Sequence, residues 1–376
     1  MRPELEDLVR PNAFLVFFSL FLVVGIISNK LMEDLGHGFS IYFFFYSALA
    51  VVFFAIGSRF TIDVPSRYIS IIFILYGIAM SFGEYGAYSI PIIIIIYAIY
   101  VKWGLIERYC GIISVIGALF LTVNLVMVGA LPAIETGIRF ESQTVLMLFG
   151  YAFCLLGVNY LFHADQRKGI VMGSMVFIIV LLYGFRSYLL VFLLSLGTQS
   201  ILKGNTRKWR LILGSVAVAA IIVIGGYLVV GNLDQQWHLS AQSLFLYRIG
   251  FTTHMFDEAC AASGLWGVLH GEIWAMPSTS PLIGEYLTGG GNITTTIFGP
   301  IVLDGGVLEM PLVLFLGASV NTLYHRAVDM KVHMPLYAIF FSILLISIEI
   351  SPIPIFFFCM LFVLMVVNRT AVQKAE

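Results

Sequence analysis

Charged side chains are scarce in this sequence. Only 11% of its 376 residues are Asp, Glu, Lys or Arg, whereas 60% are hydrophobic and 15% are aromatic. Soluble domains carry about 25% charged residues, so this composition excludes a water-soluble globular protein and indicates a polytopic membrane protein. The formal net charge is -1, so the chain also lacks the basic excess that is typical of nucleic-acid-binding proteins.

Cysteine is rare as well, and the cysteines that occur are scattered. They form no CxxC pair, and only Cys260 falls in a predicted external loop. We therefore expect neither a disulfide framework nor a cysteine metal site, and no sequence feature predicts a cofactor. The N-terminal segment lacks a basic region followed by a cleavage site, so the first apolar run is interpreted as an uncleaved membrane span. The four cysteines are Cys110, Cys154, Cys260 and Cys359.

Apolar runs of membrane-spanning length recur along the whole chain. They predict an all-α membrane protein of about 12 transmembrane helices, which form a single transmembrane domain over residues 1–376. The runs lie at about residues 13–30, 40–57, 68–82, 86–101, 110–129, 143–162, 169–183, 187–202, 209–231, 298–324, 334–350 and 352–367.

The basic residues predict the orientation of these spans. If the N-terminus is inside, all but four of the 20 Lys and Arg residues lie in cytoplasmic segments, as the positive-inside rule requires. We therefore expect a multi-pass protein of the cytoplasmic (inner) membrane with both termini in the cytoplasm. The exceptions are Lys30, Arg139, Arg186 and Arg248. Arginines that depart from the rule point to an anionic ligand, so we expect an active site that faces outward.

The apolar stretch from residue 169 to 202 is interrupted at Tyr183-Gly184-Phe185-Arg186-Ser187. As one helix it would be about 50 Å long, which exceeds the roughly 30 Å hydrocarbon core, so the chain is expected to fold back at this turn. The turn would hold Arg186 below the outer surface in a protein-lined cavity. The alternative is that Arg186 snorkels to lipid headgroups. Residues 68–101 repeat this arrangement, with Glu84 at the turn.

Residues 232–297 form a long external loop that is expected to be partly helical, most clearly from Ser240 to Ala261. His254 lies three and four residues before two acids, so either acid can contact it on one helical face. A histidine that a carboxylate orients is a workable general base. The alternative is an ordinary histidine on a solvated helix face. The two acids are Asp257 and Glu258.

The same loop ends in the passage Gly289-Gly290-Gly291-Asn292-Ile293-Thr294-Thr295-Thr296. Its backbone N–H groups and hydroxyls are suited to a sugar or a phosphate, although it matches no nucleotide-binding fingerprint. Asn292-Ile293-Thr294 also fits a glycosylation sequon.

Four features between about residues 125 and 326 occur in a characteristic order. They are the external passage Gly129-Ala130-Leu131-Pro132 leading to Gly137-Ile138-Arg139-Phe140-Glu141, the turn from Tyr183 to Ser187, the large external loop, and Asn292 to Gly306 followed by a span that ends in Leu323-Tyr324-His325-Arg326. In this order and topology the chain resembles the Wzy-type polymerases of O-antigen and related oligosaccharide repeat units.

The resemblance implies an all-helical fold related to the lipid-dependent (GT-C-like) glycosyltransferases. It also implies a reaction of cell-envelope and lipopolysaccharide synthesis, in which a growing glycan on polyprenyl diphosphate is transferred to the next lipid-linked repeat unit. The leaving diphosphate needs fixed positive charge, and a charged hydrogen bond is worth about 1.5 to 3 kcal/mol. Arg139, Arg186 and Arg248 can supply this charge without a metal.

The acceptor hydroxyl also needs a base. His254 is the first candidate for this role and Glu141 is the second. Asn292 and Thr294 are expected to contact the glycan or the diphosphate. The expected partners are polyprenyl-diphosphate-linked oligosaccharides, the lipid bilayer, a flippase and a chain-length regulator, and no nucleic acid.

Two other functions fit the sequence. An O-antigen ligase would transfer finished polymer to a different acceptor, and sequence alone does not separate it from a polymerase. A lipid-linked oligosaccharide flippase or other transporter would share the predicted layout, but transporters rarely need an external loop of about 65 residues, and the two halves show no repeat.

A metal-dependent glycosyltransferase that uses a lipid monophosphate would carry acids in a long first external loop. Glu33-Asp34 here stand in a loop of only about nine residues.

Overall fold

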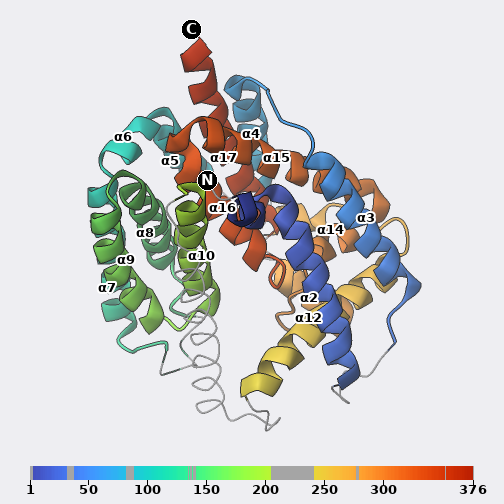
Figure 1. Cartoon of the computed structure of the whole chain (residues 1–376). Coiled ribbons are helices and arrows are strands. Elements are labelled where there is room, and N and C mark those ends of the chain that lie inside the picture. The colour runs from blue at the N-terminus through green and yellow to red at the C-terminus, as the bar shows by residue number, and fades with distance from the viewer. Residues whose placement is uncertain are drawn as a thin grey trace. The chain divides into compact units, whose positions relative to one another are not determined.

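The computed structural model describes residues 3–31, 38–81, 89–133, 135, 138, 141–204, 241–276, 279–351 and 353–375. Within these ranges every regular element is a helix (Figure 1), which confirms the predicted all-α class. Within the described residues, each predicted span overlaps a helix. The span 209–231 and Glu84 lie outside the described residues.

The helices divide into those before and those after residues 205–240. The earlier ones are α1 (Pro3–Glu6), η1 (Asp7–Val9), α2 (Pro11–Leu31), α3 (Ile41–Gly57), α4 (Ser66–Ser81), α5 (Ser89–Val101), α6 (Trp103–Arg108), α7 (Cys110–Val128), α8 (Val145–Ala164), α9 (Gln166–Leu182) and α10 (Arg186–Leu202). The later ones are α12 (Ala241–Ser263), η5 (Glu272–Ala275), α13 (Thr279–Thr288), α14 (Phe298–Gly305), η6 (Gly306–Glu309), α15 (Met310–Asp329), η7 (Lys331–His333), α16 (Met334–Ile346) and α17 (Ile353–Ala375).

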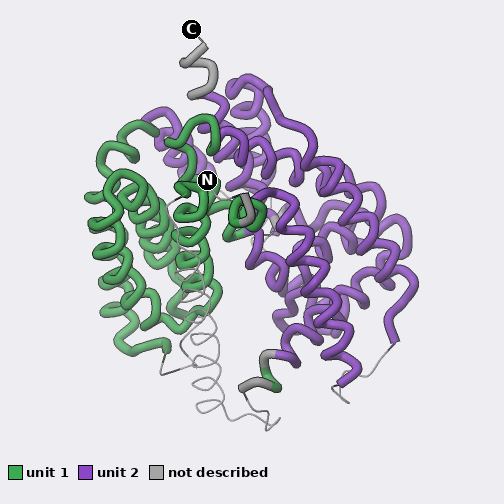
Figure 2. Tube along the Cα trace, in the orientation of Figure 1, with its two compact units in different colours: residues 1–9, 103–245, 327–343 green, residues 10–102, 246–326, 344–376 purple. Residues whose placement is uncertain are grey.

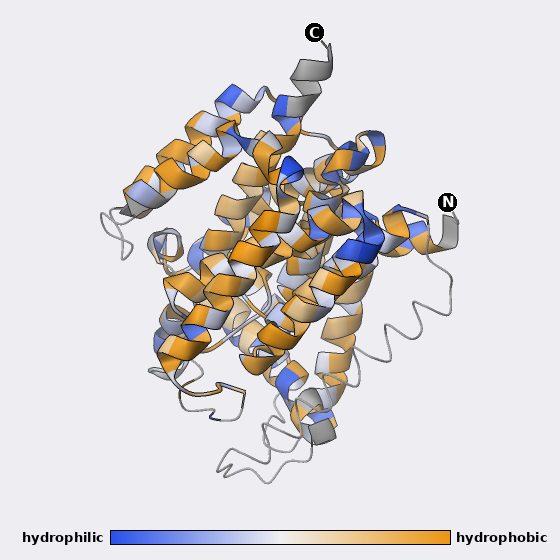
Figure 3. Cartoon of the chain, turned by 90° about the vertical axis from the view of Figure 1, so that its left-hand side faces the viewer, coloured by the Kyte–Doolittle hydropathy of each residue, from blue (hydrophilic) through white to orange (hydrophobic). Residues whose placement is uncertain are grey.

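Several of these helices are suited to a lipid environment. In the described part of the chain, four helical segments are long and apolar enough to cross a membrane: Pro11–Leu31, Cys110–Val128, Val145–Ala164 and Phe298–Asp329. Figure 3 shows apolar residues along most of the length of the helices, and residues such as Val126 and Met127 are 75% exposed. Exposed apolar faces of this kind are stable in lipid and not in water. The helices therefore indicate a membrane protein, and the count of about 12 spans stays a prediction.

The chain packs as two compact units (Figure 2). Unit 1 consists of residues 1–9, 103–245 and 327–343, and unit 2 consists of residues 10–102, 246–326 and 344–376. The single transmembrane domain stays a prediction.

In unit 1, α7 and α8 pack closely through small residues. A Cβ atom on Gly117 would lie 2.6 Å from the backbone nitrogen of Cys154 and 2.7 Å from the carbonyl oxygen of Gly150. Small residues let helix backbones approach in this way, which is the usual basis of helix packing in membranes.

Asp165 is the N-cap residue of α9. Its pKa is lowered mainly by a hydrogen bond from the backbone N–H of Lys168.

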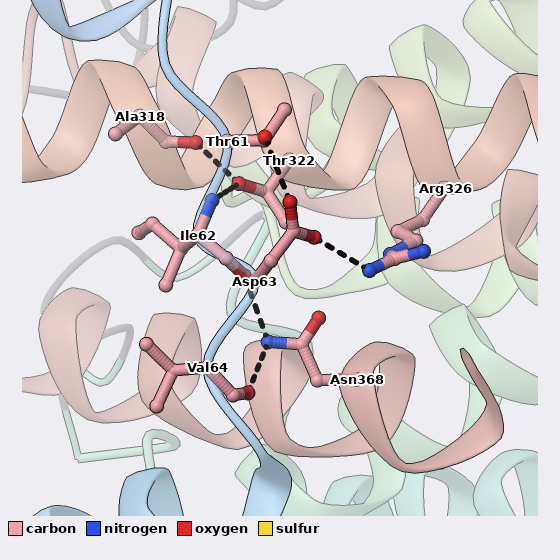
Figure 4. Close-up of polar contacts among 8 residues, drawn as sticks. All are labelled: Thr61, Ile62, Asp63, Val64, Ala318, Thr322, Arg326 and Asn368. Atoms are coloured by element: carbon pink, nitrogen blue, oxygen red, sulfur yellow. Dashed lines mark hydrogen bonds and ion pairs between the residues drawn. The ribbon is translucent and has the colours of Figure 1, made fainter. Parts of the chain in front are cut away.

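In unit 2, the extended segment that joins α3 to α4 is fixed by side chains of α15 and α17 (Figure 4). Thr322 Oγ1 accepts a hydrogen bond from the backbone N–H of Ile62 at 2.8 Å, and Asn368 Nδ2 donates to two carbonyl oxygens of the segment at 3.1 Å. Arg326 Nη2 forms an ion pair with Asp63 Oδ1 at 2.8 Å. The backbone groups of this extended segment have no partners in a regular helix or sheet, so the side chains of Thr322 and Asn368 supply hydrogen bonds to them.

The predicted span 298–324 is divided in the structure. α14 ends at Gly305, and η6 intervenes before α15 begins. Gly306 has a φ of 58°, a left-handed conformation that glycine adopts without strain. The α-helix is therefore interrupted between α14 and α15, where the apolar pattern alone predicts a continuous one.

Candidate active site

The fold-back predicted within residues 169–202 occurs in unit 1. α9 ends at Leu182 and α10 begins at Arg186, which confirms the turn. Gly184 has a φ of 70°, and a Cβ atom there would lie 3.0 Å from the Cα atom of Ala133. The turn therefore needs glycine for its conformation and for its close contact with the preceding loop.

A buried polar network holds this turn against the segment that precedes α8. Tyr183 Oη donates to the carbonyl oxygen of Leu121 at 2.6 Å and accepts from Asn124 Nδ2 at 3.1 Å. Asn124 Nδ2 also donates to the carbonyl oxygen of Ser142 at 3.0 Å, and its Oδ1 accepts from Thr144 Oγ1. Asn124 is 1% exposed and Tyr183 is fully buried, so these polar atoms depend on one another for hydrogen bonds.

Asn124 was not predicted from the sequence as a site residue, and Tyr183 was named only as the first residue of the turn. They join the turn at Tyr183 to the loop after α7, and these are two of the passages that carry the family resemblance. A signal was present, because Asn124 is the only residue with an amide side chain in the apolar run 110–129, and a polar residue in a membrane helix usually has a specific partner.

The network lies next to Arg186 and Glu141, the two candidate residues of unit 1 that fall within the described part of the chain. Arg186 is the first residue of α10 and is half-buried, whereas Glu141 is exposed beside the buried Ser142. The guanidinium group and the N–H groups of the first helical turn both favour an anion. This end of α10 is therefore suited to a negatively charged ligand. Arg139 lies outside the described residues, and the predicted cavity stays a prediction.

The candidates Arg248 and His254 lie in unit 2 on α12, which confirms the helix predicted within the long loop. The less buried face of α12 carries Tyr247, Phe251, His254 and Glu258. His254 Nε2 lies 3.9 Å from Glu258 Oε1. The structure thus brings the proposed base close to one of its two predicted acids.

The other acid, Asp257, has a different partner. Its carboxylate is 4% exposed and accepts hydrogen bonds from the backbone N–H of Ser40 at 3.1 Å and from Ser40 Oγ at 2.5 Å. Ser40 is the N-cap residue of α3, and its Oγ accepts from the backbone N–H of Phe43. Asp257 therefore fixes α12 to the start of α3.

Arg248 is also paired. Its Nε forms an ion pair with Glu349 Oε1, and the two side chains are 55% and 33% exposed. Glu349 follows the end of α16, and it was not among the candidates from the sequence. The sequence around a single acid near the end of a span does not indicate a partner 101 residues away.

Asn292 and Thr294 lie in the loop before α14. Asn292 is exposed and Thr294 is half-buried. The backbone N–H of Ile293, between them, donates to the carbonyl oxygen of Ser280 at 3.1 Å, so the loop folds back on α13, a helix that the glycine-rich composition did not predict. The fold leaves Asn292 at the surface.

A pair of acids that the sequence reasoning did not weigh lies around η6. Asp304 is 1% exposed, and its carboxylate oxygens both accept from the backbone N–H of Gly271 at 2.9 Å. Trp274 Nε1 donates to Glu309 Oε1 at 2.9 Å. These bonds tie the segment after α12 to α14 and η6. Among the residues described, no group of three or more His, Cys, Asp or Glu could hold a metal ion.

Comparison with known proteins gives the family. The chain is 24% identical over 344 residues to an uncharacterized protein of Methanocaldococcus jannaschii, an alignment that covers 89% of this chain and 81% of that protein. No solved structure matches the chain. The model of the family described as "Putative O-antigen polymerase" matches residues 7–361, nearly the whole chain, which confirms the resemblance found in the sequence. This protein belongs to the O-antigen polymerase family.

Proposed function

We propose that the protein polymerises lipid-linked oligosaccharide repeat units on the outer face of the cytoplasmic membrane. The acceptor hydroxyl oxygen attacks the anomeric carbon of the growing glycan, and the bond from that carbon to the diphosphate oxygen breaks. The polyprenyl diphosphate leaves with the bonding electron pair, and a base takes the hydroxyl proton. The family supports a polymerase of this class, and the lipid-linked substrate, the outward site and independence of metal are parts of the proposal.

Arg186 at the start of α10 is the observation that best supports this reaction. The diphosphate gains negative charge as it leaves, and fixed donors that face it lower the barrier. A guanidinium group is permanently charged and binds phosphate oxygens through a planar fork. The buried bonds of Asn124 and Tyr183 hold the turn in place, so little reorganisation is needed when charge develops. Arg139 and Arg248 are proposed to share this role.

His254 is proposed as the base. The 3.9 Å approach of Glu258 suits a carboxylate that orients the imidazole ring. Glu141, exposed in unit 1, is the second candidate for the base. Asn292 and Thr294 are proposed to contact the glycan, and the exposure of Asn292 is compatible with that role. A flippase that supplies the repeat units and a chain-length regulator are the proposed protein partners.

Deletion of the gene followed by separation of the cell's glycans on a gel tests the proposal. A polymerase is expected to leave single repeat units in place of long chains, and the wild-type gene is expected to restore the chains. Accumulation of long polymer that is not attached to its final acceptor would instead indicate a ligase. Lipid-linked repeat units that remain on the cytoplasmic side would indicate a flippase.

Purified protein gives the more direct test. Incubated with lipid-linked repeat units alone, a polymerase is expected to produce a ladder of longer lipid-linked glycans. A transporter produces no ladder under these conditions. The Arg186→Ala protein is the negative control and should produce no ladder.

A further inference from the structure

The ion pair between Arg248 and Glu349 joins two elements of unit 2. Arg248 lies on α12, and Glu349 lies in the turn that follows α16. The contact uses Nε, on one edge of the guanidinium group. A guanidinium has five N–H donors in a rigid fork, so the edge with the two terminal nitrogens is not used by this contact.

The backbone around Glu349 is fixed by hydrogen bonds. The N–H of Glu349 donates to the carbonyl oxygen of Ile346 at 3.0 Å. Two residues later, the carbonyl oxygen of Ser351 accepts from Thr279 Oγ1 at 2.7 Å. Thr279 is fully buried and Ser351 is 4% exposed. The backbone that carries Glu349 is therefore anchored by bonds that do not involve Arg248.

Stability does not account for this pair. Both side chains are substantially exposed, and ion pairs between exposed side chains contribute little to folding because water screens them and ordering them costs entropy. A fixed carboxylate does, however, restrict the orientation of a long and otherwise mobile arginine side chain. Restriction of this kind matters when the arginine has a second, planar ligand to meet.

We propose that Glu349 is a positioning residue for Arg248 in diphosphate binding. It holds the guanidinium by its Nε edge, so that the two terminal nitrogens form a fork for oxygens of the polyprenyl diphosphate. The inference rests on the proposed function, because it assigns a diphosphate to Arg248. Glu349 itself does not touch the substrate.

Steady-state kinetics of the purified full-length protein test this role. Glu349→Gln keeps the size of the side chain and removes its charge, so kcat/KM for the lipid-diphosphate donor is expected to fall about tenfold. KM for the acceptor repeat unit and the midpoint of thermal unfolding should not change. Glu349→Asp retains the charge and should recover part of the loss. Glu285→Gln, at an exposed acid on α13, is the matched control and should behave as wild type.

A double-mutant cycle isolates the coupling. If Glu349 acts through Arg248, then Arg248→Ala with Glu349→Gln should be no worse than Arg248→Ala alone. Loss of activity in Arg248→Ala together with full activity in Glu349→Gln would overturn this inference and leave the proposed function intact. Full activity in Arg248→Ala would overturn the diphosphate role of Arg248 as well. A wild-type protein that makes no polymer in vitro would contradict the proposed function itself.

Discussion

Among the candidate residues, Arg186 is the one whose positive charge points most clearly to an anionic ligand. It interrupts an apolar stretch, and it lies half-buried at the first position of α10. Its guanidinium group and the N–H groups of the first helical turn both favour an anion. An anionic substrate and the headgroups of anionic lipids are the two ligands to be distinguished.

Substitution of Arg186 by lysine distinguishes these two ligands. Lysine keeps the charge but loses the planar fork, so Arg186→Lys is expected to lower polymerisation by roughly 10- to 100-fold, the equivalent of one charged hydrogen bond of about 1.5 to 3 kcal/mol. The measurement is the rate of ladder formation with purified, equally expressed protein. Arg167→Lys, at an exposed position in the first turn of α9, is the control. Full activity in Arg186→Lys would favour the snorkelling interpretation.

His254 gives a prediction about the base. If the imidazole accepts the hydroxyl proton in the transition state, its removal should slow the chemical step. His254→Ala should therefore remove most of the activity, measured as the rate of ladder formation by the purified protein. Glu258→Gln should have a smaller effect, because Glu258 contacts only the ring. Near-normal polymer formation by His254→Ala would show that the base lies elsewhere, with Glu141 as the next candidate.

At the scale of elements, the buried network between α7 and the turn before α10 decides where Arg186 lies. Among the described residues, the backbone of the turn is bonded to the preceding loop through the Ala133 N–H, which donates to the carbonyl oxygen of Leu182 at 3.0 Å. The side chains of Asn124 and Tyr183 add a buried anchor. Buried polar groups that lose one partner carry the full cost of desolvation.

Removal of Asn124 should therefore affect both stability and activity. Asn124→Ala leaves the carbonyl oxygen of Ser142 without this donor, and we expect a loss of about 1 to 3 kcal/mol in the free energy of unfolding. Because the turn is loosened, polymerisation should fall as well. Thr122→Ala, on the exposed face of the same helix, is the control for thermal unfolding and ladder formation. An Asn124→Ala protein with wild-type stability would mean that the network does not hold the turn.

At the scale of the whole molecule, the distribution of basic residues predicts which ends of the helices face outward. With residues 232–297 outside and both termini inside, Glu285 on α13 faces the exterior and Asp329 at the end of α15 faces the cytoplasm. Both residues are exposed, so both are suitable for labelling.

Cysteine labelling in intact cells tests this orientation. In a protein that carries Cys359→Ser to remove the exposed native thiol, an impermeant reagent should label Glu285→Cys and not Asp329→Cys. Asp329→Cys should become reactive once the membrane is permeabilised, which is the control for accessibility. The reverse pattern in intact cells would contradict the outward-facing site.

The features that the sequence determined by itself are local. Helices occur where apolar runs occur, because an apolar run in lipid pairs its backbone groups within itself. The fold-back before Arg186 follows from the length of residues 169–202 and the glycine that interrupts them. A helix from Ser240 to Ala261 was also predicted, and α12 spans Ala241–Ser263. The break between α14 and α15 was not, because a single apolar window does not distinguish one long helix from two short ones.

The partners of the polar side chains were decided by the tertiary structure. Asp257 binds Ser40, 217 residues away, whereas its spacing along α12 favoured a contact with His254. Arg248 pairs with Glu349, 101 residues away, a partner that its position along the chain did not indicate. Glu258 lies on the same helical face as His254 and was predicted for that reason. A helical period fixes only neighbours three and four residues apart, and the partner of a buried charge depends on which distant helices pack beside it.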